Sequence, residues 1–237
     1  MSNFANDHLI SVIIPTLNEE KHISACLQAA RQNYPPDQVE IIVVDGGSQD
    51  GTCQQIPKHV KLMHTSPNRA LQMNQGVTES KGDILIFCHG DTRLPLNWRK
   101  RILRALKDPQ VTGGAFQSRL EPEVKSIRWI NIFKLPQDWR FMYGDQGMFV
   151  RRSIFESMGG FPEIPLMEDV ELARKMAKRG KVVRIDARVI TDSRRMLENG
   201  PLRQIIGNAW RMISYLYLGA SPEDIAKNYQ SSREDLK

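Results

Sequence analysis

The sequence predicts an α/β fold in which a mostly parallel central sheet carries helices on both faces. Short apolar runs rich in β-branched residues alternate with segments whose apolar residues recur at helical spacing. Three of these runs end at Pro15, at Asp45 and at Gly90-Asp91, and continuous apolar runs are typical of strands that are buried on both faces. Connections long enough to hold a helix join consecutive strands in parallel, so a parallel sheet follows.

The first half of the chain contains four predicted strands. Their ranges are Leu9 to Ile14, Val39 to Val44, Lys61 to His64 and Ile84 to Cys88. We expect Asn18 to cap the helix after the first strand, with Glu19 and Glu20 in its first turn. Asp50 or Thr52 opens a short helix after the second strand. Two longer helices are predicted for residues 67–80 and 95–106, the second of which has Trp98, Ile102 and Leu106 on one face.

The second half of the chain is less regular. Residues 113–116 resemble a strand, residues 123–135 a loop with a helical turn, and residues 143–150 a return to the sheet. A helix is predicted for 168–179, a strand for 182–190, a helix from Gly200-Pro201 to about Leu218, and another from Pro222. We therefore expect one α/β domain over 1–200, with halves at 1–110 and 111–200, and a helical extension over 201–237.

The composition favours a globular protein that binds an anion. Of the 237 residues, 41% are hydrophobic and 25% are charged, which suits one domain with a core. The net charge is +6, and the basic residues are spread along the chain without a polybasic run. We therefore expect a phosphorylated ligand or an anionic surface as partner, and no nucleic acid.

The cysteines and the terminus indicate a reducing compartment. Cys26, Cys53 and Cys88 are odd in number and form no Cys-x-x-Cys pair, so we expect three small core residues and neither a disulfide framework nor a zinc site. Residues 1–8 are polar and lack the apolar core of a signal peptide. The longest apolar-leaning segment, 205–218, is interrupted by Asn208 and Arg211, so we expect no membrane span. A cytoplasmic protein is the expectation.

Polar residues stand where the predicted strands end, at the edge where open α/β sheets bind ligands. Two loops, 15–19 and 45–52, could form a nucleotide cradle in which Asp45 accepts a hydrogen bond from a base and glycines let the backbone come close. Tight turns and helix caps explain Gly46, Gly47 and Asp50 equally well.

Asp91 follows the fourth predicted strand and is a candidate metal ligand. A carboxylate at a sheet edge can hold a hard divalent cation, with a diphosphate completing the coordination. A helix cap is the alternative for Asp91. His89 projects to the same side if the strand continues, although a hydrogen-bonded core or supporting histidine is the favoured interpretation.

Further candidates follow in the second half. Glu168-Asp169 could supply a general base, although acids are common in a first helical turn because the helix dipole favours them. Gly144-Asp145-Gln146-Gly147, next to aromatic residues, suits a sugar or acceptor pocket or a plain polar turn. Guanidinium groups suit diphosphate oxygens, or simply a solvated basic edge. The residues beside the turn are Trp139, Arg140 and Tyr143. The guanidinium groups are those of Arg194 and Arg195, and of Arg69 in the first half of the chain.

Taken in order, five segments resemble the family 2 glycosyltransferases of the GT-A fold. They are Ser11-Val-Ile-Ile-Pro-Thr-Leu-Asn-Glu19, Glu40-Ile-Ile-Val-Val-Asp-Gly-Gly-Ser-Gln-Asp-Gly-Thr52, Arg69-Ala-Leu-Gln-Met-Asn74, His89-Gly-Asp-Thr-Arg-Leu-Pro95 and Met167-Glu-Asp-Val-Glu-Leu172. The match runs from about Leu9 to about Arg195, which is most of the chain.

The resemblance implies an inverting enzyme that takes a sugar from a nucleotide-diphosphate donor, typically UDP. Asp91 would hold Mn²⁺ or Mg²⁺, Asp169 would be the general base and Glu168 would support it. Residues 1–110 would bind the nucleotide and 111–200 the acceptor, a small molecule or a lipid. Acceptor contacts would be Trp139, Tyr143, Asp145 and Gln146. Donor contacts would be Pro15, Thr16, Leu17, Asn18, Glu19, Asp45, Gly47, Ser48, Arg69, Gln72, Gly90, Asp91, Arg194 and Arg195.

The chain is short for the family and departs from the family pattern at two positions. The usual Asp-x-Asp has become His89-Gly90-Asp91, so only the last carboxylate remains. Met196 stands where a tryptophan often follows the basic pair, which argues against a processive synthase. Within the family, the chain is most similar to small bacterial members associated with radical-SAM, selenodomain or arsenosugar gene clusters. The segments that carry this similarity are 69–76, 144–151, 159–162 and 218–226.

Two other functions share this kind of sheet. A nucleotidyltransferase generally needs a glycine-rich basic loop after the first strand, whereas this chain has Pro15-Thr16-Leu17-Asn18-Glu19-Glu20 there. A non-catalytic protein that binds sugar nucleotides would explain the missing first carboxylate of the metal motif. Its weakness is that the chain keeps Asp91 and the Glu168-Asp169 pair.

Residues 202–218 mix apolar side chains with Arg203, Trp210 and Arg211. A basic amphipathic helix of this kind can lie on an anionic bilayer, which would place the protein peripherally on the inner face of a membrane. Packing on the catalytic domain, or across a homodimer interface, is the alternative and is favoured.

Overall fold

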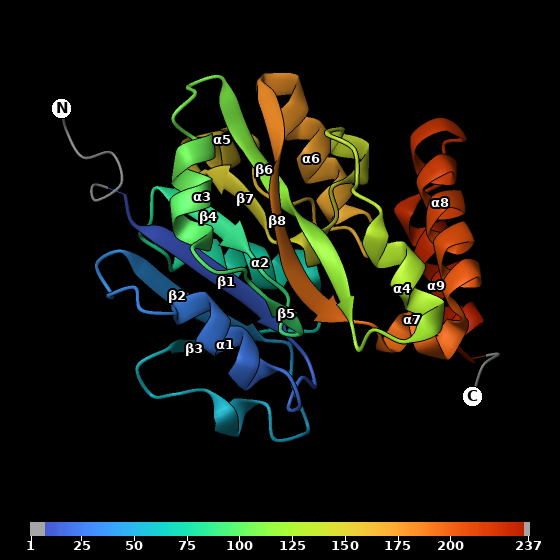
Figure 1. Ribbon diagram of the computed structural model, residues 1–237, viewed down its shortest axis with the longest axis horizontal. Coiled ribbons are helices and arrows are strands. Elements are labelled where there is room, and N and C mark those ends of the chain that lie inside the picture. The colour runs from blue at the N-terminus through green and yellow to red at the C-terminus, as the bar shows by residue number, and fades with distance from the viewer. Residues whose placement is uncertain (1–7, 235–237) are drawn as a thin grey trace.

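The computed structural model describes residues 8–234, and the side chains of residues 8–229. The predicted polar N-terminus lies outside the described residues, except for His8. The last three residues of the predicted helical extension, 235–237, also lie outside them. Figure 1 shows a twisted central sheet with helices on both faces and a group of helices at one end of the molecule.

The sheet has eight strands in the order β3-β2-β1-β4-β7-β6-β8-β5. Every pairing is parallel except those of β7 with β4 and β6, and that of β5 with β8, so six strands share one direction and the predicted mostly parallel sheet is confirmed. The strands are β1 (Ile10–Thr16), β2 (Val39–Asp45), β3 (Lys61–His64), β4 (Ile84–Phe87), β5 (Thr92–Arg93), β6 (Val111–Glu121), β7 (Met148–Arg151) and β8 (Lys181–Asp192).

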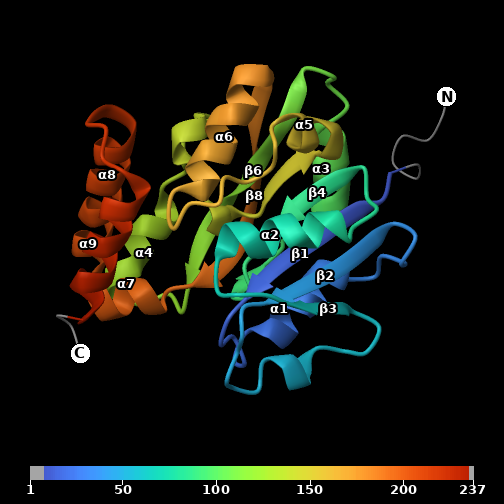
Figure 2. The same cartoon turned by 180° about the vertical axis from the view of Figure 1, so that it is seen from behind.

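Helices cover both faces of this sheet, as Figures 1 and 2 show. One apolar cluster joins the sheet to α1 and α3, and a second joins it to α2, α5 and α6. The helices are α1 (Ile23–Arg31), α2 (Arg69–Thr78), α3 (Trp98–Ala105), α4 (Lys125–Ile132), α5 (Arg152–Ser157), α6 (Glu168–Arg179), α7 (Arg194–Asn199), α8 (Pro201–Tyr217) and α9 (Pro222–Glu234). Short 3-10 turns are η1 (Cys53–Gln55), η2 (Trp139–Phe141) and η3 (Gly144–Gln146).

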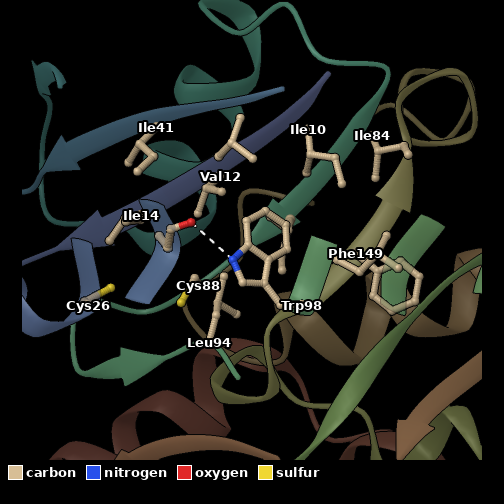
Figure 3. Close-up of a cluster of buried hydrophobic side chains, with 14 of the residues drawn as sticks. Ile10, Val12, Ile14, Cys26, Ile41, Ile84, Cys88, Leu94, Trp98 and Phe149 are labelled. Atoms are coloured by element: carbon tan, nitrogen blue, oxygen red, sulfur yellow. Dashed lines mark hydrogen bonds between the residues drawn. The ribbon is translucent and has the colours of Figure 1, made fainter. Parts of the chain in front are cut away.

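Trp98 anchors the first cluster. Its side chain is fully buried among Val12, Ile14 and Leu94, and its Nε1 donates to the carbonyl of Ala30 at 3.1 Å (Figure 3). A buried indole needs such a partner, because an unpaired N–H in an apolar core is costly. The bond therefore ties α3 to the end of α1 on the same face of the sheet.

Several element boundaries differ from the sequence prediction. The first helix begins at Ile23 with His22 at its N-cap, so the prediction that Asn18 caps it was wrong. Asn18 has a positive φ of 56°, and its Oδ1 accepts from the backbone N–H of Gln49, which joins two loops. Residues 143–147 form η3 and its flanks, so β7 is shorter than predicted, while β6 and β8 are longer. Residues 125–132 form a regular helix.

Cys26, Cys53 and Cys88 are free thiols, as expected. Cys26 and Cys88 are buried, but Cys53 is partly exposed and is not a core residue. Within residues 8–234, no helix is both long and apolar enough to cross a membrane.

Candidate active site

The carboxyl ends of β4 and β8 open into a cavity of about 240 Å³. Its walls come from the turn after β4, from η3, from the first turns of α6 and α7, and from the C-terminal helices. Sequence-distant charged groups thus meet in one place. They include Arg69, Asp91, Asp145, Glu168, Asp169, Arg194 and Arg195, all predicted as site residues.

The acid pair stands at the N-terminus of α6, where the helix dipole favours negative charge. Glu168 is only 2% exposed, and its Oε1 lies 3.2 Å from Nη1 of Arg69, close enough for an ion pair although not aligned for a hydrogen bond. Burial raises the pKa of Glu168 to about 6; Arg69 opposes the rise and Asp169 adds to it. Arg69 thereby supports a carboxylate that the protein interior would otherwise keep protonated.

Asp169 is held in a fixed orientation. Its Oδ2 accepts from the N–H of Gly144 at 2.8 Å, and its Oδ1 accepts from the N–H of Val170 at 2.7 Å. A Cβ at position 144 would lie 2.8 Å from Nε2 of His89, so a side chain there would require the His89 ring to move. The carboxylate therefore faces the cavity with one backbone bond on each oxygen.

Asp145 and His89 line this cavity, and each carries a buried polar atom without a partner. Oδ1 of Asp145 and Nε2 of His89 have no hydrogen-bond partner among the residues that the structure describes. Burial, followed by the charges of Asp91 and Asp169, raises the pKa of Asp145 to about 6. Burial, with Arg69 and Arg195 nearby, holds the pKa of His89 well below its usual range. Nε2 of His89 is thus an unpaired ring nitrogen among the described residues, whereas the sequence favoured a hydrogen-bonded histidine.

The first two strand-end loops are joined to each other by hydrogen bonds, and none of their residues lines the cavity. The N–H of Asn18 donates to Oγ of Ser48 at 2.8 Å, and the N–H of Glu19 donates to Oγ1 of Thr52 at 2.8 Å. Asp45 accepts from the N–H groups of Gly47 and Ser48, both at 2.8 Å, and from the Ser48 hydroxyl. Burial opposes ionisation of Asp45, but these hydrogen bonds outweigh it and lower its pKa.

Other predicted donor residues have different surroundings. Gln72 is buried, and its Nε2 donates to the carbonyls of Thr16 and Val44, at 3.0 and 2.8 Å, so it links β1, β2 and α2. Pro15 is buried within β1, whereas Leu17 is 43% exposed at the loop tip. Gly90 packs tightly, because a Cβ there would lie 3.1 Å from Glu19 Cγ.

The groups around Asp91 fit a hard divalent cation. Within the described part of the chain, Oγ1 of Thr16 and Oε2 of Glu19 are buried oxygens without a hydrogen-bond partner, and burial together with the charge of Asp91 raises the pKa of Glu19. Nη2 of Arg194 lies 2.6 Å from Oε1 of Glu19 and 3.8 Å from Oδ2 of Asp91. Oxygen donors of this kind suit Mn²⁺ or Mg²⁺.

A second group of potential metal ligands consists of Asp45, Cys53 and His64, whose ligand atoms lie within 4.8 Å of one another. Thiol and imidazole ligands suit zinc better than manganese or magnesium. This cluster is formed by the last residues of β2 and β3 and by the first residue of η1, and it does not line the cavity. The oxygen atoms around Asp91 therefore fit Mn²⁺ or Mg²⁺ better than this cluster does.

Two predicted acceptor residues lie away from the cavity walls. Trp139 packs against the second apolar cluster, with Arg140 over its ring at 4.8 Å. Gln146 is buried, and its Oε1 accepts from Nη1 of Arg184 at 2.8 Å. Tyr143 does line the cavity, and burial, with Asp169 and Asp145 nearby, raises its pKa to about 12.

The sequence did not reveal Arg184 or the cavity wall formed by the C-terminal helices. Arg184 is buried in β8 and donates to the carbonyls of Pro136, Phe116 and Phe141, so it holds the loop that precedes the site. No local motif marks it. Polar residues at helical spacing in α8 could have revealed the wall: its lining residues are Gln204, Asn208, Arg211 and Met212, with Tyr229 from α9.

Comparison with known families identifies the architecture. The model of the family described as "Glycosyl transferase family 2" matches residues 11–159. The chain belongs to glycosyl transferase family 2. Among curated relatives, Glycosyltransferase AglE of Haloferax volcanii is 29% identical over 175 residues, covering 65% of this chain and 56% of AglE. Probable glycosyltransferase YdaM of Bacillus subtilis is 28% identical over 208 residues, covering 77% and 50%. The chain thus spans about half the length of these relatives.

Solved structures of glycosyltransferases share the fold. The mannosyltransferase PcManGT of Pyrobaculum calidifontis, in complex with GDP-Man and Mn²⁺, matches with a TM-score of 0.61 and 22% identity over 77% of this chain and 56% of PcManGT. TarS of S. aureus, in complex with UDP, matches with a TM-score of 0.62 and 16% identity over 87% and 64%. The predicted GT-A fold is therefore confirmed.

Proposed function

We propose that the chain is an inverting glycosyltransferase that moves a sugar from a nucleotide-diphosphate donor, with UDP as the expected nucleotide. The observation that carries this proposal is that Asp91 and Asp169, from two distant segments, face one cavity together with Arg69, Arg194 and Arg195. Family membership and the nucleotide complexes of the structural relatives support it.

The donor would span two neighbouring regions. Its base would lie against loops 15–19 and 45–48, where Asp45 is ionised and already oriented by backbone donors. Its diphosphate would lie beside Asp91, where the guanidinium groups of Arg194 and Arg195 can neutralise oxygens. A divalent cation held by Asp91, with Glu19 and Thr16 next to it, would supply charge neutralisation for the leaving diphosphate.

Asp169 would act as the general base. The acceptor hydroxyl loses its proton to Asp169 as its oxygen bonds to the anomeric carbon of the sugar, and the bond from that carbon to the diphosphate breaks on the opposite face. Inversion follows because the entering and leaving oxygens lie on opposite sides of the carbon. The hydrogen bonds from Gly144 and Val170 keep the carboxylate in position for the proton.

The same proposal assigns parts of the chain. Residues 1–110 would bind the nucleotide, residues 111–200 would hold the acceptor, and the helices from 201 onwards would close the acceptor side of the cavity. Segments 69–76, 144–151, 159–162 and 218–226 support membership of the subgroup of small bacterial transferases associated with radical-SAM, selenodomain or arsenosugar gene clusters. The buried unpaired atoms of His89 and Asp145 would contact hydroxyl groups of the sugar or the acceptor.

Asp169→Asn tests the base assignment. We expect turnover of the donor, measured as nucleotide release, to fall by about 10²–10⁴-fold, because general-base catalysis typically contributes that much. Affinity for UDP, measured by calorimetry with Mn²⁺, should stay within about threefold of wild type. The exposed Glu163→Gln variant serves as the control and should change neither quantity. Turnover of Asp169→Asn at the wild-type rate would refute the assignment.

A further inference from the structure

Helix α8 has its polar face towards the protein and its apolar face towards solvent. Gln204, Asn208 and Arg211 line the cavity described above, as does Met212. On the same side, the hydroxyl of Tyr215 donates to Oε1 of Glu171 at 2.6 Å, which fixes α8 against α6. Surface helices of globular domains normally show the reverse orientation, with the apolar stripe turned to the core.

The outer face of α8 is a continuous apolar stripe. Leu202, Ile206, Trp210, Ile213 and Tyr217 are each between 44% and 65% exposed. Spacings of three and four residues place them on one side of the helix, along a length of about 24 Å. A stripe of this size, with two aromatic residues, indicates a surface that another apolar phase covers.

The charge of the region indicates what kind of partner covers this apolar stripe. Helix α8 has no acidic residue, and of its two basic residues Arg203 is exposed outside the cavity, whereas Arg211 lines the cavity. Helix α4 repeats the pattern: it exposes Trp129 and Ile132, its two charged residues are basic, and it has no acidic residue. Figures 1 and 2 show α4 and α8 at the same end of the molecule. The net charge of +6 attracts an anionic surface and opposes a second copy of the chain.

We propose that the outer face of α8 docks on an anionic lipid bilayer. An amphipathic helix in the plane of the interface buries its apolar face among the acyl chains while basic residues contact headgroups. Docked in this way, α8 separates the lipid phase from the cavity by the width of one helix.

Co-sedimentation of the full chain with vesicles tests the docking. We expect binding to vesicles of phosphatidylcholine with phosphatidylglycerol, at least tenfold weaker binding to phosphatidylcholine alone, and weakening with added salt. The double variant Ile206→Ser/Trp210→Ser should bind at least tenfold more weakly than wild type. Leu96→Ser, which removes a 78% exposed leucine from the loop before α3, is the matched control and should bind as wild type does.

Three control measurements are made on the double variant. Unchanged circular dichroism and thermal melting show that the double variant folds, and unchanged UDP affinity shows that its donor site is intact.

No binding of the wild type to anionic vesicles at low salt, or equal binding by the double variant, would overturn the proposal. A wild-type dimer in sedimentation velocity that the double variant abolishes, without vesicle binding, would assign the stripe to a second copy. Vesicle binding without any UDP affinity would leave the docking standing and refute the transferase.

Discussion

The raised pKa of Asp145 predicts a pH-dependent change in the free energy of unfolding that can be measured. Burial is the largest cause that raises the pKa of its carboxyl group, from 3.8 to about 6; Asp91 and Asp169 add to the rise, and Arg195 and Arg69 oppose it. Asparagine has nearly the same shape and cannot ionise. The variant Asp145→Asn should therefore remove an electrostatic cost that the folded protein bears at neutral pH.

The magnitude follows from linkage. The folded-state pKa lies above the unfolded value, so the folded form binds more protons between about pH 4 and pH 6 and wild-type stability falls as pH rises through that window. A shift of about two pKa units corresponds to about 3 kcal/mol in total. Between about pH 4.5 and pH 7.5, the part lost is about 2 kcal/mol, so the stability of Asp145→Asn relative to wild type should increase by that amount.

Urea unfolding of both proteins at the two pH values measures this difference in the free energy of unfolding. A chelator is present so that no divalent cation neutralises the site. Thermal unfolding gives a second measure: at the higher pH, the melting temperature of Asp145→Asn should exceed that of wild type by several degrees more than at the lower pH, since 1 kcal/mol moves the melting temperature of a chain this size by about 2–4 °C. Glu163→Gln, at an exposed position, should show no pH-dependent gain. A relative stability of Asp145→Asn that does not change with pH would refute the reasoning.

Two further predictions concern packing. Gly76→Ala should destabilise the fold by about 1–3 kcal/mol in urea unfolding, because its Cβ would lie 2.5 Å from Cγ2 of Ile13. The control Gly207→Ala brings its Cβ no closer than 3.4 Å to the side chain of any described, non-adjacent residue and should be neutral or stabilising by up to about 1 kcal/mol. Equal effects of the two substitutions would contradict the packing described. Trp98→Phe should cost about 1–3 kcal/mol through a lost hydrogen bond and a small void, whereas exposed Trp210→Phe should leave the melting temperature unchanged.

The sheet edge at which these polar residues lie was largely predictable because its signals are local. Strands that end at Asp45, and at the turn that carries Asp91, place polar groups at one edge of a parallel sheet, and sequence order alone fixes that edge. The helix that begins at Glu168 was also predicted, since a run of acids and helical periodicity occur together. The assignment of Asn18 as a cap failed because its side chain bonds to the neighbouring loop at Gln49, a contact between segments 31 positions apart.

The sequence by itself determined the family, the α/β architecture and the residues that meet at the strand ends, because periodicity, turn residues and motif order are properties of neighbouring positions. Only the tertiary structure decided which groups are unpaired, which pKa values shift and which side of α8 faces the cavity. Arg69 became the partner of Glu168, His89 kept a free nitrogen, and the apolar stripe turned outwards. These outcomes depend on burial and on contacts across 20 to 100 positions, which no local pattern encodes.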